Sequence, residues 1–207
     1  MRLRLAGALW LLAGLLYLVS ETIAAAAFDH YSYAHNYISD LGVPYPLTDG
    51  TVSSLAWVMN FGGFILDGIL YGTAAVIAFR QMPAFGRGFL TFAAIHSIGT
   101  ILVGTVHSGP RELAAGIHHF HVIGAAMAIV GGNAVSIAAS RADGSTLYSR
   151  ISLGLGLFGL ISLAMLETNR VLGTAILPDG LFERGSVYPI TAWEILTGTM
   201  LLVGKNR

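Results

Sequence analysis

Six long apolar runs divide this sequence, and they constrain its fold more than any other feature. A helix needs about 20 mostly apolar residues to cross the hydrocarbon core of a bilayer, and most of the runs reach that length. Turn-forming residues separate the runs, and no heptad pattern or long internal repeat is present. The sequence therefore predicts an all-α fold, a polytopic transmembrane helix bundle of six helices in a single membrane domain over residues 1–207. The predicted helices cover about 5–28, 53–79, 88–106, 117–139, 151–166 and 189–204.

The composition supports a membrane protein because the chain has too few charges for a surface that faces water. Charged residues make up 11% of the chain and apolar residues 55%, whereas a soluble domain has about a quarter of its residues charged. Membrane lipids are therefore the expected partners of its surface. The formal net charge is zero, so we expect no nucleic-acid partner. The absence of cysteine excludes disulfides and thiolate metal sites.

The first apolar run has a second interpretation, as a secretory signal peptide. Arg2 and Arg4 precede the run, and the small residues Ala25 and Ala27 near its end resemble a cleavage site. The run is longer than the apolar core of a signal peptide. We therefore expect it to be kept as the first transmembrane helix.

The cations in the loops predict that both termini lie in the cytoplasm. Cytoplasmic loops of membrane proteins carry an excess of lysine and arginine. With the N-terminus inside, the cytoplasmic segments hold eight cations and the outer segments three, which together make the 11 of the chain. An odd number of helices would break this alternation. The eight are Arg2, Arg4, Arg80, Arg87, Arg141, Arg150, Lys205 and Arg207, and the three are Arg111, Arg170 and Arg184.

Asp67 and His96 are two ionisable residues that fall near the middle of their predicted helices. Ionisable groups inside a bilayer are costly and mark candidate functional sites. The second and third helices are consecutive and antiparallel, so the two side chains are expected to meet as a buried polar pair. One interpretation is a pair that fixes the register of the two helices, and the other is a proton relay.

A larger group of polar residues is predicted at the outer membrane face. Six of the seven histidines fall there, together with carboxylates from several segments. His118 and His121 share a helix face because they are three residues apart. His107 follows His96 by eleven residues, which is close to three full turns. The candidate catalytic residues are Asp40, His107, His118, His121 and Ser39, and the candidate ligand-binding residues are Glu21, Asn60, Glu167 and Glu194.

The outer histidines and Asp40 also suit a metal site. Imidazole and carboxylate groups bind zinc, manganese or iron, so the candidate ligands of a divalent metal such as zinc are His107, His118, His121 and Asp40. The spacing of His118 and His121 lacks the glutamate of the H-E-x-x-H zinc motif. A site for a ligand head group, or a solvated rim with loop-packing roles, are the two alternatives.

Small residues on the second predicted helix indicate a close helix contact. Gly68 and Gly72 form a G-x-x-x-G motif, which lets two membrane helices approach closely. The contact is expected within one chain. The alternative is a dimer face, which would make the protein a homo-oligomer.

Two short sequence motifs carry a resemblance to a known family. Tyr37-Ile-Ser-Asp-Leu-Gly42 follows the first predicted helix, and Asn60-Phe-Gly-Gly-Phe-Ile-Leu-Asp-Gly68 lies on the second. With Val103-Gly104 at the end of the third helix and the histidines that begin the fourth, the chain resembles the bacterial and archaeal membrane family called domain of unknown function 998. A more distant likeness is to the Frag/DRAM/Sfk-type membrane proteins.

The resemblance implies a location and gives weight to a few residues, but it implies no activity. It implies a multi-pass protein of a prokaryotic inner or plasma membrane, and the family has no settled activity or cofactor. Asp67 and the run from His118 to His121 are not part of the family pattern. The residues that the motifs give weight to are Ser39, Asp40, Gly42, Asn60 and Gly68. The residues of the first motif, 37–42, also favour a turn or helix cap, because Ser and Asp side chains accept hydrogen bonds from nearby backbone N–H groups.

Three functions remain open from the sequence. The first is an enzyme with an outward-facing site that acts on a lipid or lipid-linked head group through a metal or acid–base groups. The second is a non-catalytic lipid or small-molecule binding or transport protein that uses Asp67 and His96. The third is a structural membrane subunit. A pocket that opens sideways to lipid favours the first function, and a water path past Asp67 favours the second.

Overall fold

Helices make up the fold of the residues that the computed structural model describes, 1–141 and 146–204. The one β-bridge among them joins Phe28 to Ser53. Six helices in this part of the chain are long and apolar enough to cross a membrane, which confirms the predicted six-helix membrane bundle. The elements are α1 (Arg2–Ala26), η1 (Ser39–Gly42), η2 (Val58–Leu66), α2 (Asp67–Gln81), η3 (Pro83–Phe85), α3 (Gly86–Thr105), α4 (Pro110–Ala114), α5 (His118–Ala139), α6 (Thr146–Leu172) and α7 (Asp179–Val203).

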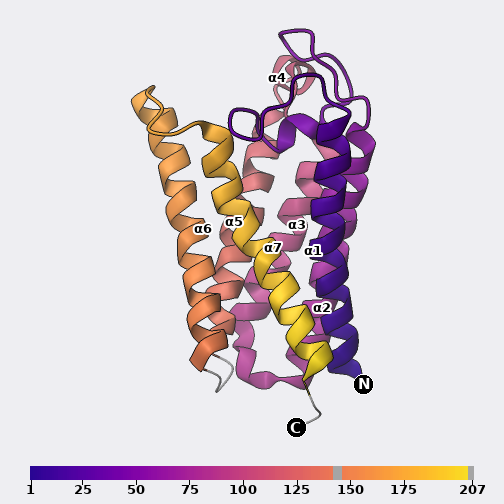
Figure 1. The fold of residues 1–207 in the computed structure, drawn as a ribbon, viewed down its shortest axis with the longest axis vertical. Helices are drawn as coiled ribbons and strands as arrows, with labels where there is room; N and C mark the ends of the chain where they lie inside the picture. Colours follow the sequence, from indigo (N-terminus) through magenta and orange to yellow (C-terminus); the bar gives the residue numbers. More distant parts are fainter. Residues whose placement is uncertain (142–145, 205–207) are drawn as a thin grey trace.

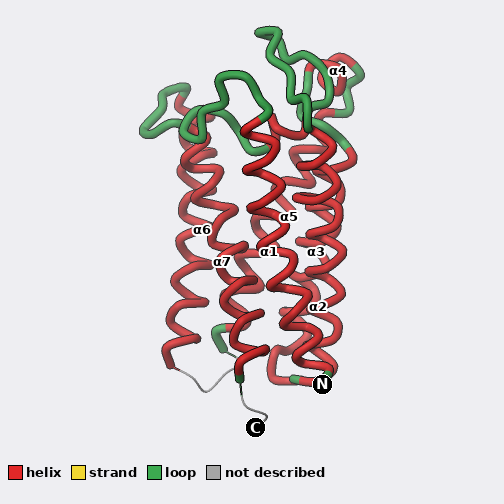
Figure 2. The backbone as a smooth tube through the Cα atoms, turned by 45° about the vertical axis from the view of Figure 1, so that its right-hand side comes forward, coloured by secondary structure: helices red, strands yellow, loops and turns green. Residues whose placement is uncertain are grey.

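The long helices form a closed ring. Each packs on the next in the order α1, α2, α3, α5, α6 and α7, and α7 packs back on α1 (Figures 1 and 2). One end of the bundle, called the loop end here, carries α4 and the segment between α1 and η2. The other end, called the terminus end, carries the start of α1 and the end of α7, where Arg4 Nη2 donates to the Leu202 carbonyl oxygen over 3.2 Å.

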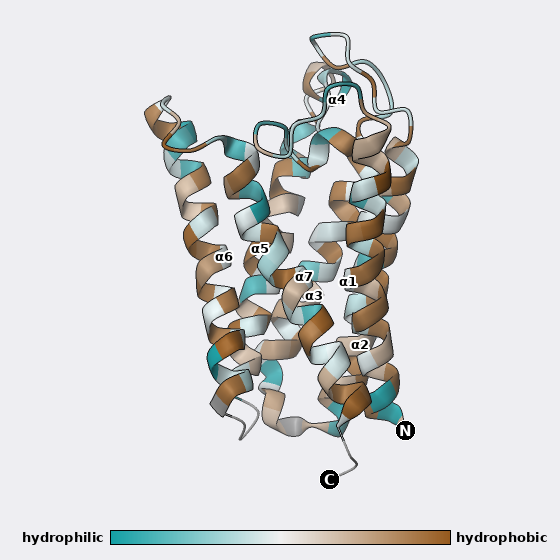
Figure 3. Ribbon diagram, viewed as in Figure 1, coloured by the Kyte–Doolittle hydropathy of each residue, from teal (hydrophilic) through white to brown (hydrophobic). Residues whose placement is uncertain are grey.

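Apolar side chains cover the outward faces of the ring. Leu12, Phe61, Ile98 and Phe158 belong to four different helices and are all exposed, and Figure 3 shows apolar residues along the length of the long helices. Such a surface is stable in lipid and not in water. The protein is therefore a multi-pass membrane protein. The cytoplasmic location of both termini stays a prediction. Two of the cations that support it, Lys205 and Arg207, lie outside the described residues.

The core of the terminus half is an aromatic cluster. Trp10, Tyr71, Phe89 and Trp193 are fully buried and come from four helices. The rings of Trp10 and Trp193 meet nearly at right angles with centroids 5.3 Å apart, a favourable geometry for aromatic pairs. This cluster fills the space between the middle of the bundle and the terminus end.

The last two helices are longer than the sequence predicts. α6 covers Thr146–Leu172 instead of 151–166, and α7 begins at Asp179 instead of 189. The prediction placed the polar residues before Pro189 in a loop and took the proline as the helix start. In the structure Arg184 is buried and paired with other groups, so the helix tolerates its charge. Pro189 lies inside α7, where it removes one backbone hydrogen bond without ending the helix.

The second membrane span opens with a π-helix. Its nine residues, Val58–Leu66, run directly into α2 at Asp67. The expected start at residue 53 was too early, because Ser53 lies in the connecting segment and donates a hydrogen bond to the Leu41 carbonyl oxygen over 2.7 Å. The wide turns of a π-helix are rare and often occur at functional sites. This one ends at a buried carboxylate.

Candidate functional site

A cavity of about 60 Å³ lies inside the ring and reaches from the loop end to the middle of the bundle. By the same measure a water molecule needs about 10–15 Å³, so the cavity has room for a few waters or a small ion. Its walls come from α1, η1, η2, α2, α3, α5 and α7, and they are mostly apolar. Ile38, Ser39 and Glu183 line it towards the loop end, and Asp67, His96 and Glu194 line it at mid-depth.

His96 and Asp67 face each other at mid-depth. The Nε2 atom of His96 lies 4.0 Å from Oδ2 of Asp67, and both side chains are buried. Nδ1 of His96 lies 2.7 Å from the backbone carbonyl oxygen of Ala128. A carbonyl only accepts hydrogen bonds, so Nδ1 carries the hydrogen, and in the neutral ring Nε2 presents a lone pair. The lone pair and the carboxylate are both acceptors.

Glu194 completes a triad with these two residues. It is 1% exposed, and one of its carboxylate oxygens lies within 4.8 Å of the ligand atoms of Asp67 and His96. Asp67 Oδ1, His96 Nε2 and Glu194 Oε1 are buried and have no hydrogen-bond partner among the residues that the structure describes. A buried polar atom without a partner costs free energy. The triad is thus three converging polar atoms without a hydrogen-bond partner in the described part of the chain.

Small residues on α5 allow the triad to form. A Cβ atom at Gly131 would lie 2.7 Å from the backbone nitrogen of His96, and one at Gly132 would lie 2.8 Å from its Nδ1. Both distances are too short for real atoms, so only glycine lets α5 approach α3 this closely. On the other side, the ring of Tyr71 lies 4.2 Å from the imidazole ring. The imidazole is therefore fixed between two helices.

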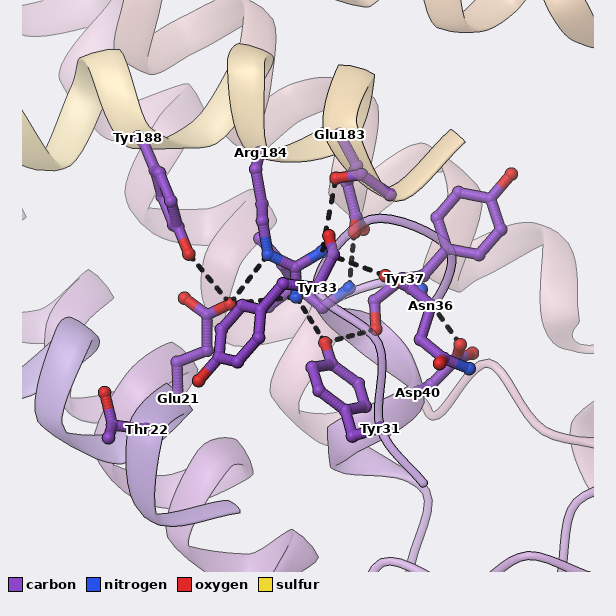
Figure 4. A network of polar contacts seen from close by, with 12 residues as sticks. Glu21, Thr22, Tyr31, Tyr33, Asn36, Tyr37, Asp40, Glu183, Arg184 and Tyr188 are labelled. Atoms are coloured by element: carbon purple, nitrogen blue, oxygen red, sulfur yellow. Dashed lines mark hydrogen bonds and ion pairs between the residues drawn. The ribbon is translucent and has the colours of Figure 1, made fainter. Parts of the chain in front are cut away.

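Arg184 holds the segment that covers the cavity at the loop end (Figure 4). This segment, residues 31–42, is called the lid here. The Arg184 guanidinium donates to the carbonyl oxygens of Tyr33 over 2.7 Å and Asn36 over 2.9 Å, and to the hydroxyl of Tyr31. It also pairs with Glu21 on α1. The lid is therefore joined to α1 and α7 through one buried side chain.

Neighbouring groups strengthen the attachment of the lid. The backbone N–H of Ile38 donates to Oε2 of Glu183. The hydroxyl of Tyr37 donates to Oδ2 of Asp179 over 2.8 Å. Burial, followed by the hydrogen bond to Asp179 and the charge of that residue, raises the pKa of Tyr37 to about 12. The hydroxyl therefore stays protonated as a donor at neutral pH.

Within the described ranges, the predicted outer residues do not bring three ligand atoms to within 4.8 Å of one another. His107 Nδ1 lies 3.3 Å from Oε1 of Glu112, and His121 Nδ1 lies 2.6 Å from the Val106 carbonyl oxygen. The rings of His118 and His121 are stacked with centroids 6.1 Å apart. Asp40 instead accepts a hydrogen bond from the Tyr37 backbone N–H over 3.0 Å. Within the described ranges, histidine nitrogens or carboxylate oxygens from three residues come within 4.8 Å of one another only at Asp67, His96 and Glu194.

The remaining candidates have separate places. Ser39 and His121 line the cavity, while Glu21 belongs to the Arg184 network. Glu167 is on the surface, where Arg170 pairs with it at 2.9 Å. The Asn60 amide donates to the Gly42 carbonyl oxygen over 2.7 Å. This hydrogen bond joins the two sequence motifs that carry the family resemblance.

Sequence reasoning missed that Glu194 belongs with Asp67 and His96. The late predicted start of the last helix placed Glu194 close to the outer membrane face. A signal was present, because the spacing of Glu183, Val187, Ile190 and Glu194 follows one face of a continuous helix. All four residues line the cavity.

Comparison with known proteins gives a family but no function. A family model described as "Protein of unknown function (DUF998)" matches residues 11–200. A search of the curated proteins and of the solved structures finds no match.

Proposed function

This chain belongs to the DUF998 family of proteins of unknown function, and we propose that it binds a small cation in the middle of the membrane as a binding or transport protein. The observation that carries the proposal is the triad of Asp67, His96 and Glu194. Three buried polar atoms with no hydrogen-bond partner among the described residues converge at the end of a cavity. Two carboxylates and a neutral imidazole attract positive charge.

The described part of the chain supplies no lysine or arginine partner to this site. Among the ion pairs of the described residues, none joins Asp67 or Glu194 to a lysine or arginine. Arg184 is buried, but its partner is Glu21. An unpaired charge inside a membrane protein is costly unless a cation or proton neutralises it. The geometry favours a cation that enters from outside the protein.

The size of the cavity favours an ion over a lipid. Its volume of about 60 Å³ accommodates a few atoms, whereas a lipid head group with its acyl chains needs a larger space. Of the five candidates for an outward-facing catalytic site, Ser39 and His121 line the cavity, whereas Asp40, His107 and His118 do not. Of the functions open from the sequence, the geometry therefore favours non-catalytic binding or transport over an enzyme that acts on lipid head groups.

The entry route follows from which end of the cavity is blocked. Towards the terminus end, the rings of Trp10, Tyr71, Phe89 and Trp193 are fully buried in one core cluster. Towards the loop end the cavity continues up to the lid. We propose that the cation enters under the lid, from the outer side of the cell membrane if both termini are cytoplasmic. The site is complete in one chain, so it requires no second copy.

A ligand-induced stability assay tests this proposal. The purified full chain in lipid nanodiscs is heated with sodium, potassium, magnesium, calcium, zinc or manganese salts at constant ionic strength. At least one cation is expected to raise the melting temperature, because a ligand that binds only the folded state stabilises it. The shift should disappear in Asp67→Asn and Glu194→Gln and persist in Glu167→Gln, which changes an exposed carboxylate. Equal shifts in all four proteins, or no shift with any cation, would contradict the proposal.

A further inference from the structure

We propose that the cation is a divalent first-row transition-metal ion, held by Asp67, Glu194 and the Nε2 atom of His96. This inference rests on the proposed function, because it names the class of ion that the same site selects. It goes further in assigning three ligand atoms and a coordination chemistry.

The imidazole decides the class of ion. Sodium, potassium, calcium and magnesium prefer oxygen ligands, whereas imidazole nitrogen suits zinc, iron, cobalt, nickel and copper. His96 presents Nε2 as a lone pair because its Nδ1–H is bound to the Ala128 carbonyl oxygen. Nε2 has no hydrogen-bond partner and is buried. A nitrogen ligand is thus already oriented towards the two carboxylates.

The spacing of the three ligand atoms fits one metal ion. Bonds from such ions to nitrogen or carboxylate oxygen are about 2.0–2.2 Å long, so two ligand atoms on one ion lie about 3–4 Å apart. His96 Nε2 and Asp67 Oδ2 are 4.0 Å apart, and all three ligand atoms lie within 4.8 Å of one another. The 4.0 Å separation is too long for a hydrogen bond. Small side-chain rotations bring the set to coordination distance.

The surroundings of His96 resemble those of a metal ligand. A ligating histidine usually donates its other ring N–H to a carbonyl or carboxylate, which fixes the tautomer and the ring plane. In this protein the Ala128 carbonyl oxygen accepts that hydrogen bond, at 2.7 Å from Nδ1 of His96. The contact with Gly131 and Gly132 holds the ring in place. The imidazole therefore needs little reorganisation to bind an ion.

Charge and coordination number also agree with a divalent ion. Two carboxyl groups that give up their protons to bind an ion carry two negative charges, which a divalent ion neutralises inside a low-dielectric bundle. Three protein ligands leave at least one position on the ion for water, as in sites where the ion is exchanged or used. The cavity above the triad supplies the space for that water. A closed structural site would use four protein ligands.

Metal titration with a spectroscopic readout tests the inference. The full chain in nanodiscs is stripped with a chelator and titrated with Zn²⁺ by calorimetry and with Co²⁺ by visible absorption. We expect one ion per chain, with Co²⁺ absorption and X-ray absorption that show one imidazole nitrogen among oxygen ligands. Loss of an outer-shell partner typically costs 10–100-fold in metal affinity, so His96→Ala should weaken Zn²⁺ binding more than about 100-fold. Asp67→Asn and Glu194→Gln should weaken it as well.

Controls separate a lost ligand from a lost fold. His118→Ala and Glu167→Gln, which lie outside the triad, should bind Zn²⁺ as the unchanged chain does. If His96→Ala is unstable, added imidazole should restore both its folding and its Co²⁺ spectrum by occupying the vacated space.

The outcomes distinguish this inference from the proposed function. If sodium, potassium, calcium or magnesium stabilises the chain through Asp67 and Glu194 while Zn²⁺ and Co²⁺ do not bind, the metal assignment is wrong and the proposed function stands. If Zn²⁺ binding depends on His118 and not on His96, the assignment is wrong. If no cation of any class binds, both proposals fail.

Discussion

The guanidinium of Arg184 lies 3.0 Å from the carboxylate of Glu21, and the two side chains are only 6% and 2% exposed. This pair joins α7 to α1, and the same guanidinium bonds two carbonyl oxygens of the lid. Removing one partner of a buried pair leaves the other charge uncompensated. The attachment of the lid therefore depends on one arginine.

Arg184→Gln should lower the free energy of unfolding by about 3–5 kcal/mol, because Glu21 stays buried without its partner. Arg184→Lys should also be destabilising, since an ammonium lacks the planar set of five donors that reaches the lid and Glu21 together. Thermal unfolding in detergent measures both effects. Arg170→Gln breaks an exposed pair and should change stability by less than about 1 kcal/mol. An equal loss at both arginines would contradict this account.

Asp67→Asn should preserve the fold better than Asp67→Leu. The asparagine amide can donate to the lone pair of His96 Nε2, which has no partner in the native protein. Leucine leaves that nitrogen buried and unsatisfied, at a cost of about 1–3 kcal/mol. Melting temperatures of the two variants in the same detergent decide the matter. Equal destabilisation by the two substitutions would show that Asp67 does not face His96.

Gly132→Ala should weaken cation binding without removing a ligand. Its new Cβ atom would lie 2.8 Å from His96 Nδ1 and 2.6 Å from Cδ1 of Ile190, so the imidazole must shift. Overpacking of this kind costs about 1–3 kcal/mol. Gly154→Ala is the matched control, because no atom lies within 4 Å of its Cβ position. Gain of helix propensity should make that variant neutral or slightly stabilised.

Single cysteines test the predicted orientation. The chain contains no cysteine of its own, so each new thiol gives an unambiguous signal. Asp49→Cys and Ile176→Cys, at the loop end, should react with a membrane-impermeant reagent in intact cells. Arg141→Cys, at the other end of the bundle, should react only after permeabilisation. Labelling of Arg141→Cys in intact cells would reverse the proposed topology.

The sequence was sufficient for the fold because lipid imposes a simple length requirement on apolar helices. It also indicated that Asp67 and His96 lie at similar depth, since each residue of a helix adds about 1.5 Å. It placed Glu194 too near the surface, because hydropathy cannot show that Arg184 is neutralised by Glu21. The charged pair made nearly three turns of α7 resemble a loop.

The outer histidines show a second limit of sequence reasoning. Their positions along the chain put His107, His118 and Asp40 at one end of the bundle. The rotation of each helix about its axis, and the path of the lid, decide where the side chains point. In the structure His107 turns to Glu112 and Asp40 to the backbone of Tyr37. Neither contact is visible in a pattern of residue types.

Arg184 and Glu194 belong to the same helix, with Pro189 between them. The missing backbone bond at Pro189 makes this the natural place for α7 to bend. If the part of α7 before the proline moves with the lid while the part after it stays packed on Trp10, the helix bends at a hinge at Pro189. Displacement of the lid and displacement of Glu194 from Asp67 and His96 would then be one motion.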